Sequence, residues 1–283
     1  MRREAFIAEG RLIVGKLLAA PRFRVRSALG TASALASLRG GLEQAGVPVY
    51  VARPETLQRI VGFHFHRGCL AAGERPAELG LDALLQPRGR RILVALEGVT
   101  NPDNVGGVFR NAMAFGADGV VLGPGCADPL YRRALRVSMG GALETPFATV
   151  FDWPEGFARF RAAAFTIAAL TPDRAAADIS AFGEVPERLV LLLGSEGEGL
   201  SAAARAAADV HVRIPMAPGV DSLNVATAAG RVASAVPRPA RRSGPPTYPR
   251  TSQKCGWVVW VTEPCWPRHR RRQGPPAERL CRS

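Results

Sequence analysis

The sequence predicts an α/β protein with two folded domains and an irregular C-terminal tail. Short, continuous apolar segments alternate with helical stretches from residue 91 onward, and the composition changes abruptly after residue 236. Continuous apolar strands are typical of a parallel sheet that is covered by helices on both faces. The length of 283 residues leaves room for about two domains.

The N-terminal segment, residues 1–85, mixes short helical and strand patterns. The stretch GLEQAGVPVYVARPETLQRIVGF predicts a helix, a strand over VPVYV and a second helix that begins at Pro54 and Glu55. We interpret residues 74–90, ERPAELGLDALLQPRGR, as a linker. The segment before the linker is therefore expected to form a small α/β domain.

The second domain, residues 91–236, has a regular alternation of strands and helices. Four apolar segments are expected to form strands: RILVALEGV from residue 91, GVVLG from 119, AFTIAAL from 164 and LVLLLG from 189. Ligands of α/β sheets bind outside the carboxyl ends of the strands. The loops that leave these ends are therefore the candidate functional site.

Residues 237–283 form an atypical basic tail. They hold ten Arg and one Lys against two Glu, a formal net charge of +9 out of +13 for the whole chain, and they show no amphipathic period. Two interpretations stay open: a natural RNA-binding extension, or a tail that is disordered or translated out of frame from a GC-rich gene. The rest of the chain is mildly basic, which permits nucleic-acid binding without arguing strongly for it.

The composition also bears on the compartment. No stretch of about 18 apolar residues suggests a transmembrane helix, and the N-terminus lacks the apolar run of a signal peptide. Five widely spaced cysteines predict neither a disulfide framework nor a zinc site. We expect a cytoplasmic protein without a bound metal, in which His64 and His66 pack within the small domain or face RNA.

The first candidate loop is LEGVTNPDNVGGVFRNAMAFG, residues 96–116. Its NPD segment predicts a turn, and Asn104 is expected to cap the helix that follows. Gly106 and Gly107 would let another backbone or a ligand approach closely. Arg110 would lie nearly two turns along this helix. Taken alone, the same residues also fit a cap, two packing glycines and a surface charge.

The second candidate loop is LLGSEGEGLS, residues 192–201. Gly194 and two further glycines surround Glu196, so backbone N–H and C=O groups are exposed to a ligand. A dinucleotide site is the alternative, but the glycine spacing is GxxGxG and not GxGxxG. The spacing therefore argues against a nicotinamide-dependent enzyme.

The third candidate loop, IPMAPGVDSLNVA, begins at Ile214, where a strand is expected to end. A helix is expected to begin at Ser222. The Leu223 side chain could cover a flat apolar ring, while Ser222 and Asn224 offer hydrogen bonds. As an isolated turn, this stretch also fits a simple helix cap.

Together the three loops resemble, in order and spacing, the motifs of the TrmH-like (SpoU) branch of the SPOUT RNA methyltransferases. The resemblance covers about residues 91–235 and rests on NPDNVGGVFRNA, LLGSEGEGLS and IPMAPGVDSLNVA. Residues 1 to about 85 more weakly resemble an L30e-like RNA-binding domain, in FIAEGRLIVGKLL and GFHFHRGCLAAGE. The implied fold is an L30e-like α/β domain followed by a SPOUT α/β trefoil-knot domain with a parallel sheet.

The resemblance implies an S-adenosylmethionine-dependent 2′-O-methyltransferase that acts on structured RNA, with ribosomal RNA ahead of transfer RNA. It also implies a homodimer. Gly194, Ile214 and Leu223 match positions that line the cofactor's adenine pocket. Leu170 and Thr171, at the end of the AFTIAALT strand, are expected to border the same pocket.

Arg110 matches the family's catalytic position, which acts on the ribose hydroxyl. Because a guanidinium is nearly always protonated, we expect it to hold a phosphate and to stabilise developing negative charge. The other polar motif positions are Asn104, Glu196, Ser222 and Asn224. The resemblance implies that they position the RNA and the reacting groups.

The last helix departs from the family pattern. The segment VATAAGRVASAV has Gly230 and Arg231 in its middle and is followed by Pro237, so about eleven helical residues remain. Such a short helix is marginal without packing. An alternative function therefore stays open, an RNA-binding protein whose transferase domain is inactive. Cofactor binding would discriminate between the two.

Overall fold

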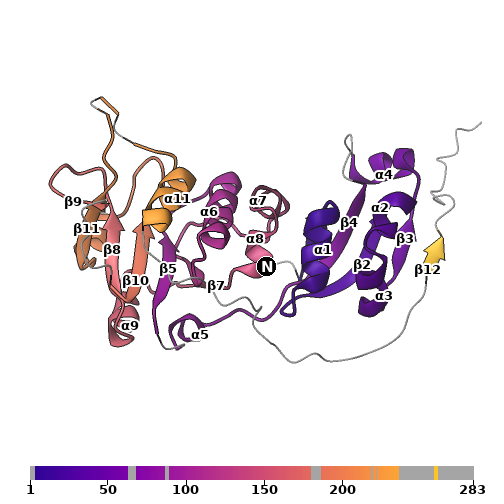
Figure 1. Ribbon diagram of the computed structural model, residues 1–283, viewed down its shortest axis with the longest axis horizontal. Helices are drawn as coiled ribbons and strands as arrows, with labels where there is room; N and C mark the ends of the chain where they lie inside the picture. Colours follow the sequence, from indigo (N-terminus) through magenta and orange to yellow (C-terminus); the bar gives the residue numbers. More distant parts are fainter. Residues whose placement is uncertain are drawn as a thin grey trace, which may run out of the picture.

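The computed structural model contains two sheets, each accompanied by helices (Figure 1). It describes residues 4–62, 68–86, 89–179, 186–217, 219–220, 222–235 and 258–260. The two histidines considered above, His64 and His66, lie outside the described residues, as does most of the basic tail. None of the described helices has the length and apolar character needed to cross a membrane.

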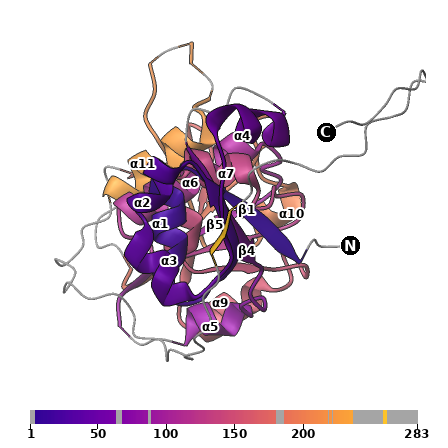
Figure 2. The same cartoon turned by 90° about the vertical axis from the view of Figure 1, so that its right-hand side faces the viewer.

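The N-terminal sheet is mixed and has the strand order β1-β4-β2-β3-β12. Strands β1 and β2 pair antiparallel with β4, whereas β3 pairs parallel with β2 and with β12. The elements are β1 (Ala5–Glu9), α1 (Arg11–Ala19), β2 (Arg24–Gly30), α2 (Ala32–Ala36), α3 (Arg39–Ala45), β3 (Val49–Val51), α4 (Pro54–Val61), β4 (Cys69–Glu74) and β12 (Val258–Trp260). The expected helix, strand and Pro54 helix are confirmed as α3, β3 and α4. In Figure 2, α1 and α3 lie side by side on one face of this sheet.

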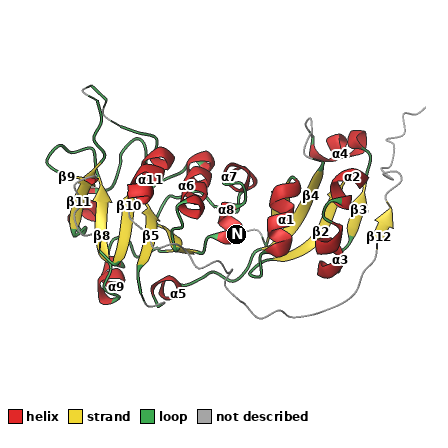
Figure 3. Cartoon of the chain, viewed as in Figure 1, coloured by secondary structure: helices red, strands yellow, loops and turns green. Residues whose placement is uncertain are grey.

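The second sheet has seven strands, all parallel, in the order β7-β6-β5-β10-β8-β11-β9. Figure 3 shows the part of this order from β5 to β9. Its strands are β5 (Arg91–Leu96), β6 (Gly119–Leu122), β7 (Phe147–Thr149), β8 (Thr166–Leu170), β9 (Ala177–Asp178), β10 (Arg188–Leu193) and β11 (Val210–Arg213). Its helices are α5 (Leu81–Leu85), α6 (Pro102–Ala114), α7 (Arg132–Val137), α8 (Gly141–Glu144), α9 (Phe157–Ala162), α10 (Ala202–Ala206) and α11 (Val225–Ala235). The four apolar segments are thus confirmed as β5, β6, β8 and β10.

Continuous apolar strands are needed because both faces of the second sheet are buried. In β5, Ile92, Val94 and Leu96 belong to one core cluster, which also contains residues of α6 and α11. Leu93 and Ala95 alternate with them and belong to a second cluster, which contains residues of α5, α9 and α10. Side chains of successive strand residues point to opposite faces, so each face has its own helical layer.

The segment expected to be a linker, residues 74–90, contains the helix α5. Its Leu81, Leu84 and Leu85 are buried in the core cluster of the second sheet, and Leu79 forms an isolated parallel bridge with Ala148. Burial of three leucines gives this segment a packing role. The connection between the two sheets is therefore attached to the second one over most of its length.

Candidate active site

The site lies at the carboxyl ends of three neighbouring strands, β10, β8 and β11. The pairing of Leu192 with Ala169 and of Val212 with Leu170 sets the ends of these strands level with one another. Thr171 continues this edge because its backbone N–H donates to the carbonyl of Val212 at 2.9 Å. The expected cofactor positions at the ends of these strands thus share one edge of the sheet.

Asn224 joins the three motif loops. Its Nδ2 donates to Asn104 Oδ1 at 3.0 Å and to Glu196 Oε1 at 2.6 Å. Asn104 is 8% exposed, whereas Glu196 and Asn224 are exposed. The structure therefore brings three of the five expected polar residues into one hydrogen-bonded group, with one residue from each motif.

The same Asn224 amide also caps the last helix. Its Oδ1 accepts from the backbone N–H groups of Ala226 at 3.0 Å and Thr227 at 3.2 Å. The expected helix start at Ser222 was wrong, because α11 begins at Val225 with Asn224 before it. Since the oxygen is held by the helix, the Nδ2 atom is directed at Asn104 and Glu196. Ser222 is exposed on the preceding loop.

The expectation that Asn104 caps α6 was also wrong. Asn101 is the cap, because its Oδ1 accepts from the backbone N–H of Asp103 at 2.9 Å. Pro102 occupies the first helical position, where its fixed φ and missing N–H are tolerated. This arrangement places Asn104 inside the first turn, where its side chain is free to accept from Asn224.

Small residues let α6 and α11 pack closely. A Cβ atom on Gly107 would lie 2.5 Å from Ala226 Cβ, and one on Gly230 would lie 3.0 Å from Asn111 Nδ2. The Asn111 amide also donates to the carbonyl of Ala226. Gly230, expected to weaken the last helix, provides the space for its contact with α6.

The second motif loop folds back on itself. Ser195 and Gly199 form an isolated antiparallel bridge, and a Cβ on Gly194 would lie only 2.1 Å from the carbonyl carbon of Gly199. No side chain fits at Gly194. A Cβ on Gly197 would meet no described atom within 4 Å, so the outer side of the loop is open.

Glu97 is a site residue that the sequence interpretation missed. Its Oε2 accepts from the backbone N–H of Ser201 at 2.9 Å and thereby ties the first motif loop to the second. The available signal was an acidic residue directly after the β5 strand. Ser201 in turn caps α10, because its Oγ accepts from Ala204 N at 3.1 Å.

Arg110 lies on the exposed side of α6 and makes no hydrogen bond or ion pair with any described residue. Another arginine, Arg133, is occupied, since its Nε and an Nη each lie 2.6 Å from the two carboxylate oxygens of Asp103. This hydrogen bonding lowers the pKa of Asp103 below its ordinary value. The guanidinium of Arg110 is therefore available to a ligand, whereas that of Arg133 is not.

A cavity of about 700 Å³ adjoins the strand edge. The residues that line it are Thr171, Pro172, Asp173, Arg174, Arg205, His211, Met216 and Val220. Of the expected cofactor residues only Thr171 belongs to this lining; Leu170 and Ile214 are half-buried nearby in sequence, and Leu223 is 39% exposed. Within the described part of the chain, no three His, Cys, Asp or Glu side chains are grouped as a metal site.

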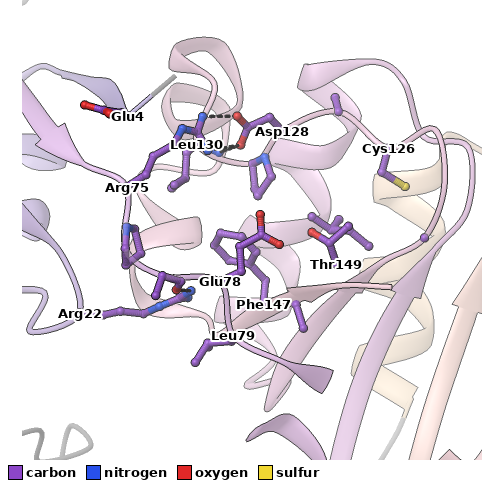
Figure 4. Close-up of a pocket in the computed structure, with 17 residues that line it drawn as sticks. Glu4, Arg22, Arg75, Glu78, Leu79, Cys126, Asp128, Leu130, Phe147 and Thr149 are labelled. Carbon is purple, nitrogen blue, oxygen red and sulfur yellow. Dashed lines mark hydrogen bonds and ion pairs between the residues drawn. The ribbon is translucent and has the colours of Figure 1, made fainter. Parts of the chain in front are cut away.

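A second crevice, of about 540 Å³, lies between the two domains, and no residue of the three motif loops lines it (Figure 4). Arg75 pairs with Asp128 across it, and the Arg22 guanidinium lies 5.1 Å from the ring centre of Phe147. The half-buried Cys126 also lines it, and burial raises the pKa of this thiol. None of the expected site residues lines this crevice.

Comparison with known proteins agrees with the motif geometry. The SpoU rRNA Methylase family matches residues 91–233. An uncharacterized tRNA/rRNA methyltransferase of Mycobacterium tuberculosis is 45% identical over 243 residues, which cover 85% of this chain and 83% of the relative. The 23S rRNA (guanosine-2′-O-)-methyltransferase RlmB of Acinetobacter baylyi is 32% identical over 193 residues, or 66% of this chain and 77% of that protein.

Among solved structures, the AdoMet-bound rRNA methyltransferase from Sinorhizobium meliloti superposes with a TM-score of 0.69 at 26% identity, covering 82% of this chain and 86% of that one. The match thus extends over both sheets. The three motif loops, their meeting at Asn224 and these relatives lead to one conclusion. The chain belongs to the SpoU family of S-adenosylmethionine-dependent RNA methyltransferases.

Proposed function

We propose that this protein transfers a methyl group from S-adenosylmethionine to a ribose 2′-hydroxyl in structured RNA, with ribosomal RNA as the substrate. The observation that carries the proposal is the group formed by Asn224, Asn104 and Glu196. It gathers polar side chains from three motifs. Arg110, exposed further along α6, makes no hydrogen bond or ion pair with any described residue. The 23S rRNA guanosine-2′-O specificity of the Acinetobacter baylyi relative supports the choice of reaction and of RNA.

The strand edge fits the cofactor. The open side of the loop around Gly197 leaves room for a ligand against backbone groups. Val220, which lines the cavity, is 47% exposed, and Leu223 is 39% exposed. Apolar side chains exposed to this extent fit the cover of an aromatic ring. We assign the adenine to Gly194, Ile214 and Leu223, with Leu170 and Thr171 at its border.

The bound cofactor would supply an electrophilic methyl group, so the protein's task is to hold the RNA and manage charge. A ribose hydroxyl is a weak nucleophile, and its proton must leave as its oxygen gains a bond to carbon. The Arg110 guanidinium stays charged, so it is suited to bind a phosphate and to stabilise negative charge on that oxygen. It is unsuited to accept the proton, which would pass to solvent water while S-adenosylhomocysteine leaves with the electron pair of the broken sulfur–carbon bond.

The remaining polar residues are positioning groups in this proposal. Asn224 holds the Glu196 carboxylate at 2.6 Å, which fixes one acceptor oxygen and leaves the other open to RNA. Ser222, exposed on the loop before α11, offers a further donor and acceptor. Orientation of this kind can supply a large part of a rate enhancement when the methyl donor is already reactive.

Two further proposals rest on the family resemblance. The N-terminal domain would bind the structured RNA, and two copies of the chain would form a homodimer. Filter binding of RNA to the full-length protein tests the first, and sedimentation equilibrium tests the second. A monomer at concentrations that support full activity would contradict the dimer.

The first experiment is calorimetric titration of the full-length protein with S-adenosylmethionine. We expect saturable binding at one site per chain. Folded protein that does not bind the cofactor would contradict the proposal and favour the alternative of an RNA-binding protein with an inactive transferase domain. The basic tail is kept in this experiment, because its strand β12 pairs with β3 of the N-terminal sheet.

The second experiment uses unmodified 23S rRNA transcribed in vitro and radiolabelled cofactor. The product is hydrolysed with alkali, because strand cleavage needs a free 2′-hydroxyl and a 2′-O-methyl group therefore leaves a resistant dinucleotide. Arg110→Ala should lower transfer by about 100-fold or more while leaving cofactor affinity nearly unchanged. Arg90→Ala, an exposed arginine at the amino end of β5, is the matched control. Label recovered only in mononucleotides would overturn the assignment to the ribose.

A further inference from the structure

Lys16 of the N-terminal domain contacts two helices of the second domain. Lys16, on α1, has its Nζ 3.2 Å from Glu144 Oε1 on α8 and 3.4 Å from Met113 Sδ on α6. Its side chain is 20% exposed, so the ammonium is largely withdrawn from water. Met113 lies three residues after Arg110, one turn further along the same helix.

The space around Lys16 fits a lysine closely. Gly140 has a φ of 78°, and a Cβ placed on it would lie 2.9 Å from Lys16 Cδ. The lysine stem therefore packs on bare backbone before its ammonium reaches Glu144. The chain has only two lysines among its 37 Lys and Arg residues, so a lysine stands here in a protein that otherwise uses arginine.

A second ion pair reinforces the same interface. Glu9, at the end of β1, is 3% exposed, and its Oε2 lies 3.5 Å from Arg132 Nε at the start of α7. Apolar residues of α1, including Leu17, belong to the same core cluster as Phe109 of α6. The two domains therefore share packed and paired groups, which favours one fixed relative orientation.

We propose that Lys16 is a positioning residue that fixes the RNA-binding domain against α6, so that RNA held by that domain reaches Arg110 in one register. This inference rests on the proposed function. A misplacement of about 1 Å remote from the reacting atoms can cost on the order of 100-fold in rate. Because the Lys16 ammonium contacts both α8 and α6, it restrains both the sliding and the rotation of α1 across these helices.

The experiment compares Lys16→Met, which keeps the stem and removes the charge, with Glu144→Gln, which leaves the lysine in place. Glu144 is 45% exposed in its side chain, so its replacement disturbs no core. Lys16→Arg tests rescue by a conserved charge. Glu43→Gln is the matched control, because its pair with Arg39 at 2.8 Å lies within α3.

Two readouts are measured on the full-length protein. The first is the distance distribution between spin labels attached through p-acetylphenylalanine at Ser33 and Ala162, both exposed and in different domains. The second is single-turnover methyl transfer to in vitro transcribed 23S rRNA at increasing RNA concentration. Melting temperature and cofactor affinity are recorded for each variant.

We expect one narrow distance peak for the wild type and for Glu43→Gln, and a broad distribution for Lys16→Met and Glu144→Gln. The maximal transfer rate of these two variants should fall about tenfold or more, with cofactor affinity within about twofold of wild type. Lys16→Arg should restore part of both readouts.

A narrow peak or a wild-type rate in folded Lys16→Met would overturn the proposal. A wild-type protein without methyl transfer would contradict the proposed function instead, and the distance distributions would then decide the role of Lys16.

Discussion

Asn224 Nδ2 donates to Asn104 Oδ1 at 3.0 Å, between residues that are 120 positions apart in the chain. Asn104 is 8% exposed, and a buried amide oxygen without a partner costs about 1–3 kcal/mol. The residue that caps the last helix thus also satisfies a buried polar group of the first motif. Stability and the geometry of the site depend on the same side chain.

Replacing Asn224 should separate its two roles. Asn224→Ala removes both the helix cap and the hydrogen bonds to Asn104 and Glu196. Asn224→Ser keeps a capping oxygen, but its side chain is too short to reach Asn104 and Glu196. We expect the serine variant to be about 1 kcal/mol more stable than the alanine variant, and both to lose methyl transfer on the order of 100-fold. Urea unfolding and the transfer assay check this. Wild-type transfer by Asn224→Ser would show that the bridge does not matter for the reaction.

The second motif loop should distinguish between two glycines that are three residues apart. Gly194→Ala forces a Cβ to within 2.1 Å of Gly199, so we expect loss of cofactor binding and a lower melting temperature. Gly197→Ala meets no described atom within 4 Å and should keep the fold. Calorimetric titration of both variants measures the difference. Equal affinities would mean that the loop adjusts freely and that its tight fold is not required.

The contact between α6 and α11 should tolerate no added methyl group. Gly107→Ala places a Cβ 2.5 Å from Ala226 Cβ, so we expect a loss of about 1–3 kcal/mol in the free energy of unfolding. Gly40→Ala, in the exposed helix α3 with no atom within 4 Å, should instead gain about 0.5–1 kcal/mol. Chemical denaturation gives both values. A neutral Gly107→Ala would indicate that the two helices are loosely packed in solution.

The pair formed by Asp103 and Arg133 predicts a pH effect. Hydrogen bonding to Arg133 lowers the pKa of Asp103 from 3.8, so the stabilisation is fully present above pH 4 and is lost as the pH falls through the lowered value. The difference in free energy of unfolding between wild type and Asp103→Asn should therefore be constant near neutral pH and shrink as the pH falls below 3.8 and through the lowered pKa of Asp103. Arg133→Met should show the same trend. A difference that grows on acidification would contradict this assignment.

Much of the fold could be predicted because both faces of the second sheet are buried. That burial leaves unbroken apolar segments in the sequence, and β5, β6, β8 and β10 follow them closely. The position of the motif loops then follows from the rule that ligands bind at the carboxyl ends of parallel strands. The short β7 and β9 gave weaker signals, since two or three residues show no clear period.

The errors in the site have local causes. Two asparagines three residues apart precede the apolar face of α6, and the preference of proline for the first helical position favours Asn101 over Asn104 as the cap. The late start of α11 at Val225 follows from the cap at Asn224, whose side-chain oxygen accepts from the backbone N–H groups of Ala226 and Thr227. Contacts such as that between Lys16 and Glu144 leave no local pattern, because they join distant parts of the chain.

The close seating of α11 on α6 has a consequence for the order in which the molecule is made. All seven strands of the second sheet are synthesised before Asn224 leaves the ribosome. Until then the side-chain oxygen of Asn104 lacks its hydrogen-bond donor, Asn224 Nδ2. The space beside Gly107 is likewise not yet filled by the methyl group of Ala226. Since long-range contacts form slowly, we expect the group formed by Asn224, Asn104 and Glu196 to be the last part of the second domain to form, so that methyl transfer would report that this domain has finished folding.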